Sequence, residues 1–82
     1  MINIQDEIKK HRLRRGINGA LPPKAVDFET QGNFTICAVR RAQRAGLGVA
    51  KRNPQTDLPD SDIGRKVALW RALDRFYARA GA

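Results

Sequence analysis

The sequence has one cysteine, Cys37, and one histidine, His11, among its 82 residues. A single cysteine excludes an internal disulfide and any cysteine-rich zinc site. With so few ligating or nucleophilic side chains, neither a metal site nor a Ser-His-Asp or Cys-His arrangement can be assembled. We therefore expect a protein that is not an enzyme and that has no cofactor.

Long hydrophobic runs are also missing. No apolar stretch approaches the roughly 20 residues that a membrane-spanning helix needs, and the N-terminal segment mixes acids with bases, unlike a signal peptide. Aromatic residues make up only 6%, but hydrophobic residues reach 41%, which favours a folded chain over a disordered one. We expect one small cytosolic domain over residues 1–82, without a deep cleft for a small-molecule substrate.

Acidic residues are scarce, with eight Asp and Glu against sixteen Lys and Arg, so that the net charge is +8. This excess predicts attraction to polyanions, among which nucleic acid is the commonest. An acidic protein surface would respond to the same charge. Three acids, Asp57, Asp60 and Asp62, follow one another closely between two basic groups.

The N-terminal segment predicts a helix over about residues 3–15. Asn3 can cap it, and Asp6 and Glu7 stand in the first turn, where the helix dipole favours acids. Gly16 is placed to end it. His11 falls on the same stripe as two isoleucines and is expected to be a partly buried helix residue.

Three strands are predicted next. Residues 25–31 alternate between apolar and polar side chains, which favours a strand, although Pro23 could instead open a short helix closed by Gly32. Residues 33–41 are rich in β-branched and aromatic side chains. After a loop of about five residues, in which Gly46 would supply a positive φ and Arg44 would stand at the tip, the chain resumes as a strand over 46–52.

The C-terminal segment predicts the strongest helix, over about residues 61–80, capped by Asp60 or Ser61. Its apolar residues form a wide arc at helical spacing, which places Trp70 in the core; the arc consists of Ile63, Val67, Trp70, Leu73, Phe76 and Tyr77. The fold class is therefore predicted as α+β, a three-stranded antiparallel sheet with the N- and C-terminal helices packed on one face (α-β-β-β-α).

Several motifs accompany this element order: Arg14-Arg15-Gly16 at the end of the first helix, the turn Gln31-Gly32-Asn33, the run Gly46-Leu47-Gly48, and the basic pair Arg65-Lys66. Together they resemble the double-stranded-RNA-binding domain. The resemblance implies that the first helix and the loop between the first two strands touch the RNA minor groove, and that the start of the last helix contacts phosphates. Residues 48–54 and 63–73 also resemble small bacterial and phage domains of unknown function.

The basic residues of the predicted hairpin and closing helix are the candidate site for nucleic acid or a partner, because they can grip successive phosphates. They are Arg40, Arg41, Arg44, Lys51, Arg52, Arg65, Lys66, Arg71 and Arg75. We expect them to form one continuous positive surface of a non-catalytic nucleic-acid-binding module. The alternative is a protein-interaction module, such as a phage- or mobile-element-encoded inhibitor, that docks its basic face on an acidic host protein.

Overall fold

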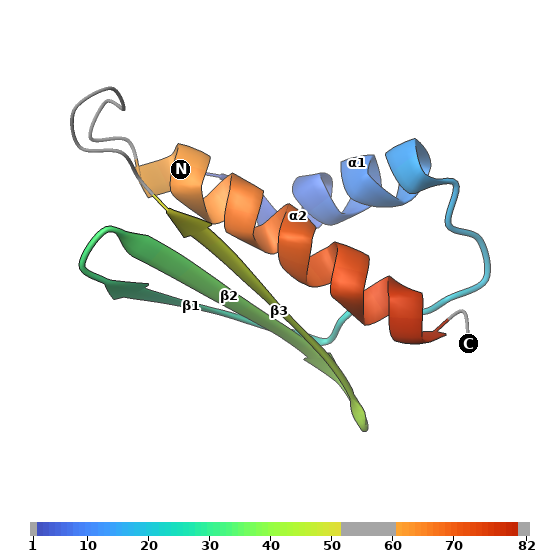
Figure 1. Cartoon of the computed structure of the whole chain (residues 1–82). Helices are drawn as coiled ribbons and strands as arrows, with labels where there is room; N and C mark the ends of the chain where they lie inside the picture. Colours follow the sequence, from blue (N-terminus) through green and yellow to red (C-terminus); the bar gives the residue numbers. More distant parts are fainter. Residues whose placement is uncertain (1, 52–60, 81–82) are drawn as a thin grey trace.

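The structure is a computed structural model that describes residues 2–51 and 61–80, with only the main chain of residues 61, 79 and 80. Its elements follow the predicted order and confirm the α+β class (Figure 1). They are α1 (Ile4–Arg15), β1 (Ala25–Gln31), β2 (Phe34–Arg41), β3 (Arg44–Lys51) and α2 (Ser61–Ala80).

The three strands form an antiparallel sheet in the order β1-β2-β3. Cys37 at the centre of β2 pairs with Phe28 on β1 and with Gly48 on β3. Both helices lie on the same side of this sheet, with α2 across β2 and β3 and α1 beside α2 (Figure 1). Neither of the described helices covers the opposite side, which we call the open face of the sheet.

Helix α1 begins and ends as the sequence predicts. The side chain of Asn3 accepts a hydrogen bond from the Asp6 N–H at 3.2 Å. Gly16 has the left-handed conformation, with φ 63°, and the next residue, Ile17, donates its N–H to the Arg12 carbonyl at 2.9 Å. Gly16 is suited to this position because a glycine carries no Cβ that would oppose a positive φ.

Residues 25–31 form a strand, so the alternative of a short helix is wrong. The hairpin between β2 and β3 also differs from the prediction. Its turn has only two residues, Ala42 and Gln43, and Ala42 carries the positive φ of 54°. Gly46 lies inside β3, and Arg44 begins that strand instead of standing at a loop tip.

The glycines of β3 are needed because α2 packs directly on the strand. A Cβ on Gly48 would overlap the main chain of α2 at the Ala68 carbonyl oxygen and the Ala72 nitrogen. A Cβ on Gly46 would lie 2.7 Å from the Phe76 nitrogen. The short side chains of Ala68 and Ala72 allow the same close approach, because they leave room for the helix to lie near the strand.

The core lies between the sheet and α2. Cys37 and Val39 from β2 are fully buried. The residues of α2 that are buried in the same core are Ala68, Leu69, Ala72, Leu73, Phe76 and Tyr77. Leu73, Phe76 and Tyr77 of the predicted apolar arc are buried, which confirms that part of it. The other part was wrong: Ile63 is 60% exposed, Val67 is 36% exposed and Trp70 is only half-buried. The packed side of the helix includes Ala68 and Ala72 in their place, because these small residues let the helix approach the sheet.

The remaining predictions fall partly outside the structure. The end of the third strand at residue 52, the acidic segment with Asp57 and Asp60, and the cap by Asp60 lie outside the described residues. Within residues 2–51 and 61–80, neither helix combines the length and the apolar character needed to cross a bilayer.

Candidate nucleic-acid interface

The contact between α1 and α2 is polar at one end. Glu7 is buried, and its Oε2 accepts a hydrogen bond from the Trp70 indole N–H at 2.9 Å. The Nζ atoms of Lys10 and Lys66 lie 3.7 and 3.9 Å from Glu7 Oε1. The buried carboxylate therefore holds one lysine of each helix close to the same point.

A second polar contact joins the helices at Asp74. The His11 ring nitrogen Nε2 is 2.7 Å from Asp74 Oδ1, and Arg15 donates to both carboxylate oxygens at 2.9 and 3.2 Å. Burial alone would raise the pKa of Asp74, but the hydrogen bonds from Arg15 and His11, together with the positive charge of Arg15, bring it below the ordinary value. Asp74 is thus a charged acceptor between the helices.

His11 is fully buried instead of partly buried as predicted. Its ring stacks on Tyr77, with centroids 5.7 Å apart, and meets Trp70 edge-on at 5.1 Å. The bond to Asp74 satisfies one ring nitrogen. Among the described residues Nδ1 has no hydrogen-bond partner, so His11 serves packing and the Asp74 contact.

A groove of about 780 Å³ runs between the outer sides of α1 and α2. Its apolar lining consists of Leu13, Val67 and Trp70, of which Leu13 is 83% exposed. Five cationic side chains and one carboxylate, Asp74, complete the lining. We call this feature the cationic groove, after its cations Lys10, Arg14, Arg15, Lys66 and Arg71.

Arg71 and Arg75 continue the positive charge from the groove to the edge of the sheet. Arg71 donates from Nη1 to the Val49 carbonyl at 2.6 Å, and Arg75 donates in the same way to the Leu47 carbonyl at 2.9 Å. Strand β3 is an edge strand, so these carbonyls have no strand partner beyond β2. The two guanidinium groups are therefore held along one line while remaining exposed.

The arginines at the turn between β2 and β3 do not line the cationic groove. Arg41 donates to the Pro22 carbonyl at 3.1 Å and Arg44 to the Leu21 carbonyl at 3.3 Å. The Arg44 guanidinium also lies 4.6 Å from the centroid of the Phe76 ring. Both side chains thus tie the end of the hairpin to the segment between α1 and β1.

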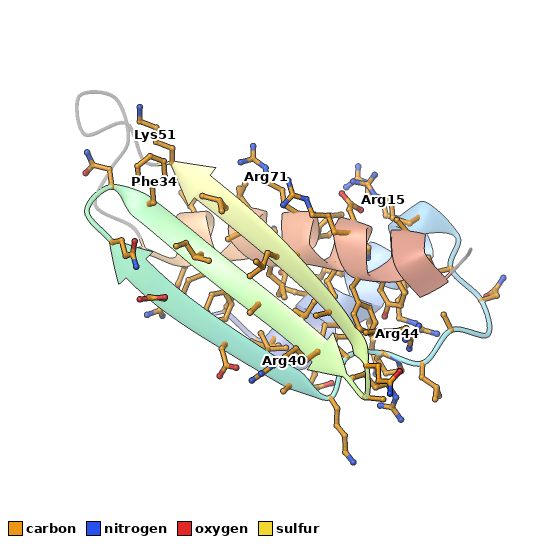
Figure 2. All side chains as sticks on the ribbon, turned by 60° about the horizontal axis from the view of Figure 1, so that its bottom comes forward. Arg15, Phe34, Arg40, Arg44, Lys51 and Arg71 are labelled. Atoms are coloured by element: carbon orange, nitrogen blue, oxygen red, sulfur yellow. The ribbon has the colours of Figure 1, made fainter. Side chains whose placement is uncertain are left out.

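Arg40 and Lys51 lie on the open face of the sheet, away from the helices (Figure 2). Arg40 pairs with Asp27 at 3.2 Å, and Lys51 Nζ is 5.8 Å from the Phe34 ring centroid. Figure 2 shows Arg15 and Arg71 beside α2, whereas Arg40 lies over the strands. The hairpin and the helix therefore do not join their arginines into the single surface that we expected.

Two further predicted residues are Arg65 and Arg52. Arg65 lies near the start of α2, 4.0 Å from Asp62 and 5.9 Å from the Phe28 ring centroid. Arg52 is outside the described residues. Of the predicted set, the structure brings together Lys66, Arg71 and Arg75.

The predicted list of site residues omitted the cations of α1, although the resemblance implied contacts from the first helix. Lys10, Arg14 and Arg15 line the cationic groove, although the predicted site contained no residue of this helix. The spacing of four between Lys10 and Arg14 could have indicated one positive stripe on α1. The spacing within α1 could not show that this stripe faces α2, because that depends on how the two helices pack.

Cys37 lies in the core and does not line the cationic groove. Burial, reinforced by the charge of Asp27, raises the pKa of the Cys37 thiol to about 12, so the thiol is not a nucleophile at neutral pH. The described residues contain no cluster of three His, Cys, Asp or Glu side chains that could hold a metal ion.

Comparisons with protein-family models, with curated proteins and with solved structures found no match. The resemblance to double-stranded-RNA-binding domains accordingly remains a prediction from motifs and element order.

Proposed function

We propose that this protein is a non-catalytic nucleic-acid-binding module that contacts the phosphate backbone through the cationic groove and the adjoining Arg75. The observation that carries this proposal is the balance of charge around the groove. Five cations from two helices surround it. Two carboxylates offset part of this charge, because Asp74 is bound to Arg15 and buried Glu7 lies near Lys10 and Lys66. The cations still outnumber the carboxylates, so a polyanion that enters the groove meets net positive charge, with Arg14 on one helix and Arg71 on the other.

Arg71 and Arg75 are suited to contact phosphates because the sheet edge orients them. A guanidinium carries five N–H donors, and the main-chain carbonyls of β3 engage one nitrogen of each. The other donors stay available for phosphate oxygens. The two positions are four residues, and therefore about 6 Å, apart along α2.

The groove favours backbone contacts over base contacts. The indole N–H of Trp70 is bound to Glu7, and the Arg15 guanidinium lies 5.8 Å from the indole centroid. Trp70 is thus already engaged and offers no free stacking platform. Duplex RNA is the first ligand to test, because the resemblance implies that α1 and the start of α2 contact RNA. Lys10 lies on α1 and Lys66 lies near the start of α2, and both line the groove.

The test is a salt titration of binding to duplex RNA, duplex DNA and single strands, followed by fluorescence anisotropy. For Arg71→Gln and for Lys10→Gln we expect weaker binding, with a slope of log K against log salt smaller by about one in each case. Arg40→Gln is the matched control, because it removes one charge from the open sheet face. The control should leave affinity nearly unchanged.

Two results would contradict the proposal. One is no binding to any of the three ligands at low salt. The other is a loss of affinity in Arg40→Gln equal to that in Arg71→Gln, in proteins whose circular dichroism matches the wild type. Arg71→Lys serves as a second variant, since it keeps the charge and should retain most of the affinity.

One observation favours the alternative of an acidic protein partner. Leu13 is 83% exposed and lines the groove together with the cations, and an exposed leucine adds nothing to phosphate binding. An acidic segment that also carries apolar side chains would use both features. Leu13→Ser separates the two functions, because it should leave the affinity for duplex RNA unchanged and should weaken binding of such a protein segment.

A further inference from the structure

A buried carboxylate lies behind the cationic groove. Glu7 of α1 is buried and does not belong to the groove lining, whereas Lys10 and Lys66 both line the groove. The ammonium nitrogens of the two lysines lie within 3.9 Å of the same oxygen, Glu7 Oε1. A ligand in the groove therefore meets the lysines, and Glu7 acts on it through them and through its charge.

The Glu7 carboxylate is itself held in one orientation. Its other oxygen, Oε2, accepts the hydrogen bond from the indole N–H of Trp70 at 2.9 Å. Trp70 is fixed in turn by its edge-on contact with the buried His11 ring. Because these contacts join α1 to α2, Oε1 is kept at one place between the helices, where it can accept from a cation on either of them.

The two lysines depend on this carboxylate because their side chains are otherwise exposed. The side chain of Lys10 is 65% exposed and that of Lys66 is 53% exposed. In the part of the chain that the structure describes, Glu7 is the ion-pair partner of each lysine. A free lysine side chain samples many rotamers, and ordering it on a ligand costs conformational entropy. Two ammonium groups close together also repel each other, and the carboxylate between them offsets that repulsion.

We propose that Glu7 is a positioning residue, which holds Lys10 and Lys66 together so that both contact one phosphate group of the nucleic acid. We call this pair of lysines the lysine clamp. The inference rests on the proposed function of the groove. A phosphate has several acceptor oxygens and can therefore contact both ammonium groups at once. Because Glu7 already orders the lysines, they lose less conformational freedom when the ligand binds.

The charge of Glu7 and its positioning effect act in opposite directions. A carboxylate near the groove repels phosphates, so its charge alone predicts that removal of Glu7 strengthens binding. Positioning predicts weaker binding, since the lysines lose their common partner. We expect positioning to dominate at about 0.15 M salt, because solvent and salt around the exposed lysines screen the repulsion, whereas the rotamer freedom of a lysine does not depend on salt.

The test is the affinity of Glu7→Gln. The amide oxygen can still accept the Trp70 N–H, but an NH2 group replaces the oxygen that both lysines approach. We expect about three- to tenfold weaker binding at about 0.15 M salt. Fluorescence anisotropy measures it on whichever of duplex RNA, duplex DNA and single strands the wild type binds best. Glu29→Gln is the matched control, because it makes the same replacement on β1, outside the groove lining, and should leave the affinity nearly unchanged.

A second measurement separates positioning from a structural role. Lys66→Gln should weaken binding in the wild type and should weaken it less in the Glu7→Gln background, where the lysine is no longer held in place. A carboxylate that only stabilised the contact between the helices would leave the effect of Lys66→Gln equal in the two backgrounds. Circular dichroism establishes that each variant is folded.

A third measurement keeps Glu7 in place. Lys10→Gln, Lys66→Gln and the double variant form a cycle that tests whether the two lysines act on the same phosphate. Lysines that share one phosphate should give a combined loss of affinity that differs from the sum of the two single losses, whereas lysines on separate phosphates should give additive losses.

The failure of this inference is distinguishable from the failure of the proposed function. Binding that depends on Arg71 but is equal or tighter in folded Glu7→Gln would overturn the lysine clamp and leave the groove as the binding site. Additive losses in the cycle of Lys10 and Lys66 would overturn the clamp as well. A wild type that binds none of the three ligands at low salt would overturn both.

Discussion

Asp74 is the residue that links the two helices most directly, because it accepts hydrogen bonds from buried His11 and from Arg15. Asp74→Asn should lower the free energy of unfolding at pH 7 by about 1–3 kcal/mol, since it weakens the bond to a buried partner. Urea denaturation measures this change. Asp27→Asn is the control: its pair with Arg40 is exposed, so it should cost less than about 1 kcal/mol.

The contribution of Asp74 to the free energy of unfolding should decrease at acidic pH. The pKa of Asp74 is lower in the folded protein than its ordinary value of 3.8. Its stabilising contribution is therefore complete above the unfolded pKa and is lost as the pH falls through the folded pKa. The stability difference between wild type and Asp74→Asn should shrink between about pH 5 and pH 2. An unchanged difference at pH 2 would refute this assignment.

At the scale of the elements, the packing of α2 on β3 depends on the absence of a side chain at Gly48. Gly48→Ala should destabilise the fold by about 3 kcal/mol or more, because the added Cβ overlaps the main chain of α2 at Ala68 and Ala72 and the helix must move. Urea denaturation with circular dichroism tests this. Leu47→Ala on the open face should cost less than about 1 kcal/mol, and equal losses in the two variants would contradict the close-packing account.

The elements themselves were predictable because their signals are local. The cap at Asn3, the stop at Gly16 and the alternation over 25–31 all depend on neighbours within a few residues, and the structure confirms them. The turn was mispredicted for a physical reason. Glycine commonly supplies positive φ in turns, but Gly46 is a glycine because α2 passes over it.

The candidate site was only partly predictable. The spacing of four between Arg71 and Arg75 indicates a shared edge of a helix, and both residues do lie along β3. Strand alternation could also have placed Arg40 on the open face, with Ala38. The hydrogen bonds between α1 and α2 join residues 59 to 65 positions apart, and no local pattern in a single sequence encodes such a pairing.

For the whole molecule, the net charge of +8 opposes compaction. Added sodium chloride should therefore raise the urea midpoint of unfolding, because about 0.1 M salt screens exposed charges beyond roughly 10 Å. The same salt should weaken the nucleic-acid binding that we propose. A midpoint that falls with salt would mean that ion pairs such as Arg15–Asp74 outweigh the repulsion.

The bonds from Arg71 and Arg75 to the carbonyls of β3 also bear on solubility. An unpaired strand edge is a template on which another chain can add a strand, and repeated addition lengthens a sheet into a fibre. Guanidinium groups already occupy the Val49 and Leu47 carbonyls, so an incoming strand would have to displace two charged donors. Arginines well placed to attract a polyanion thus also protect this edge against aggregation. Exchanging them for neutral residues would leave a chain more prone to forming fibres, even where its fold is intact.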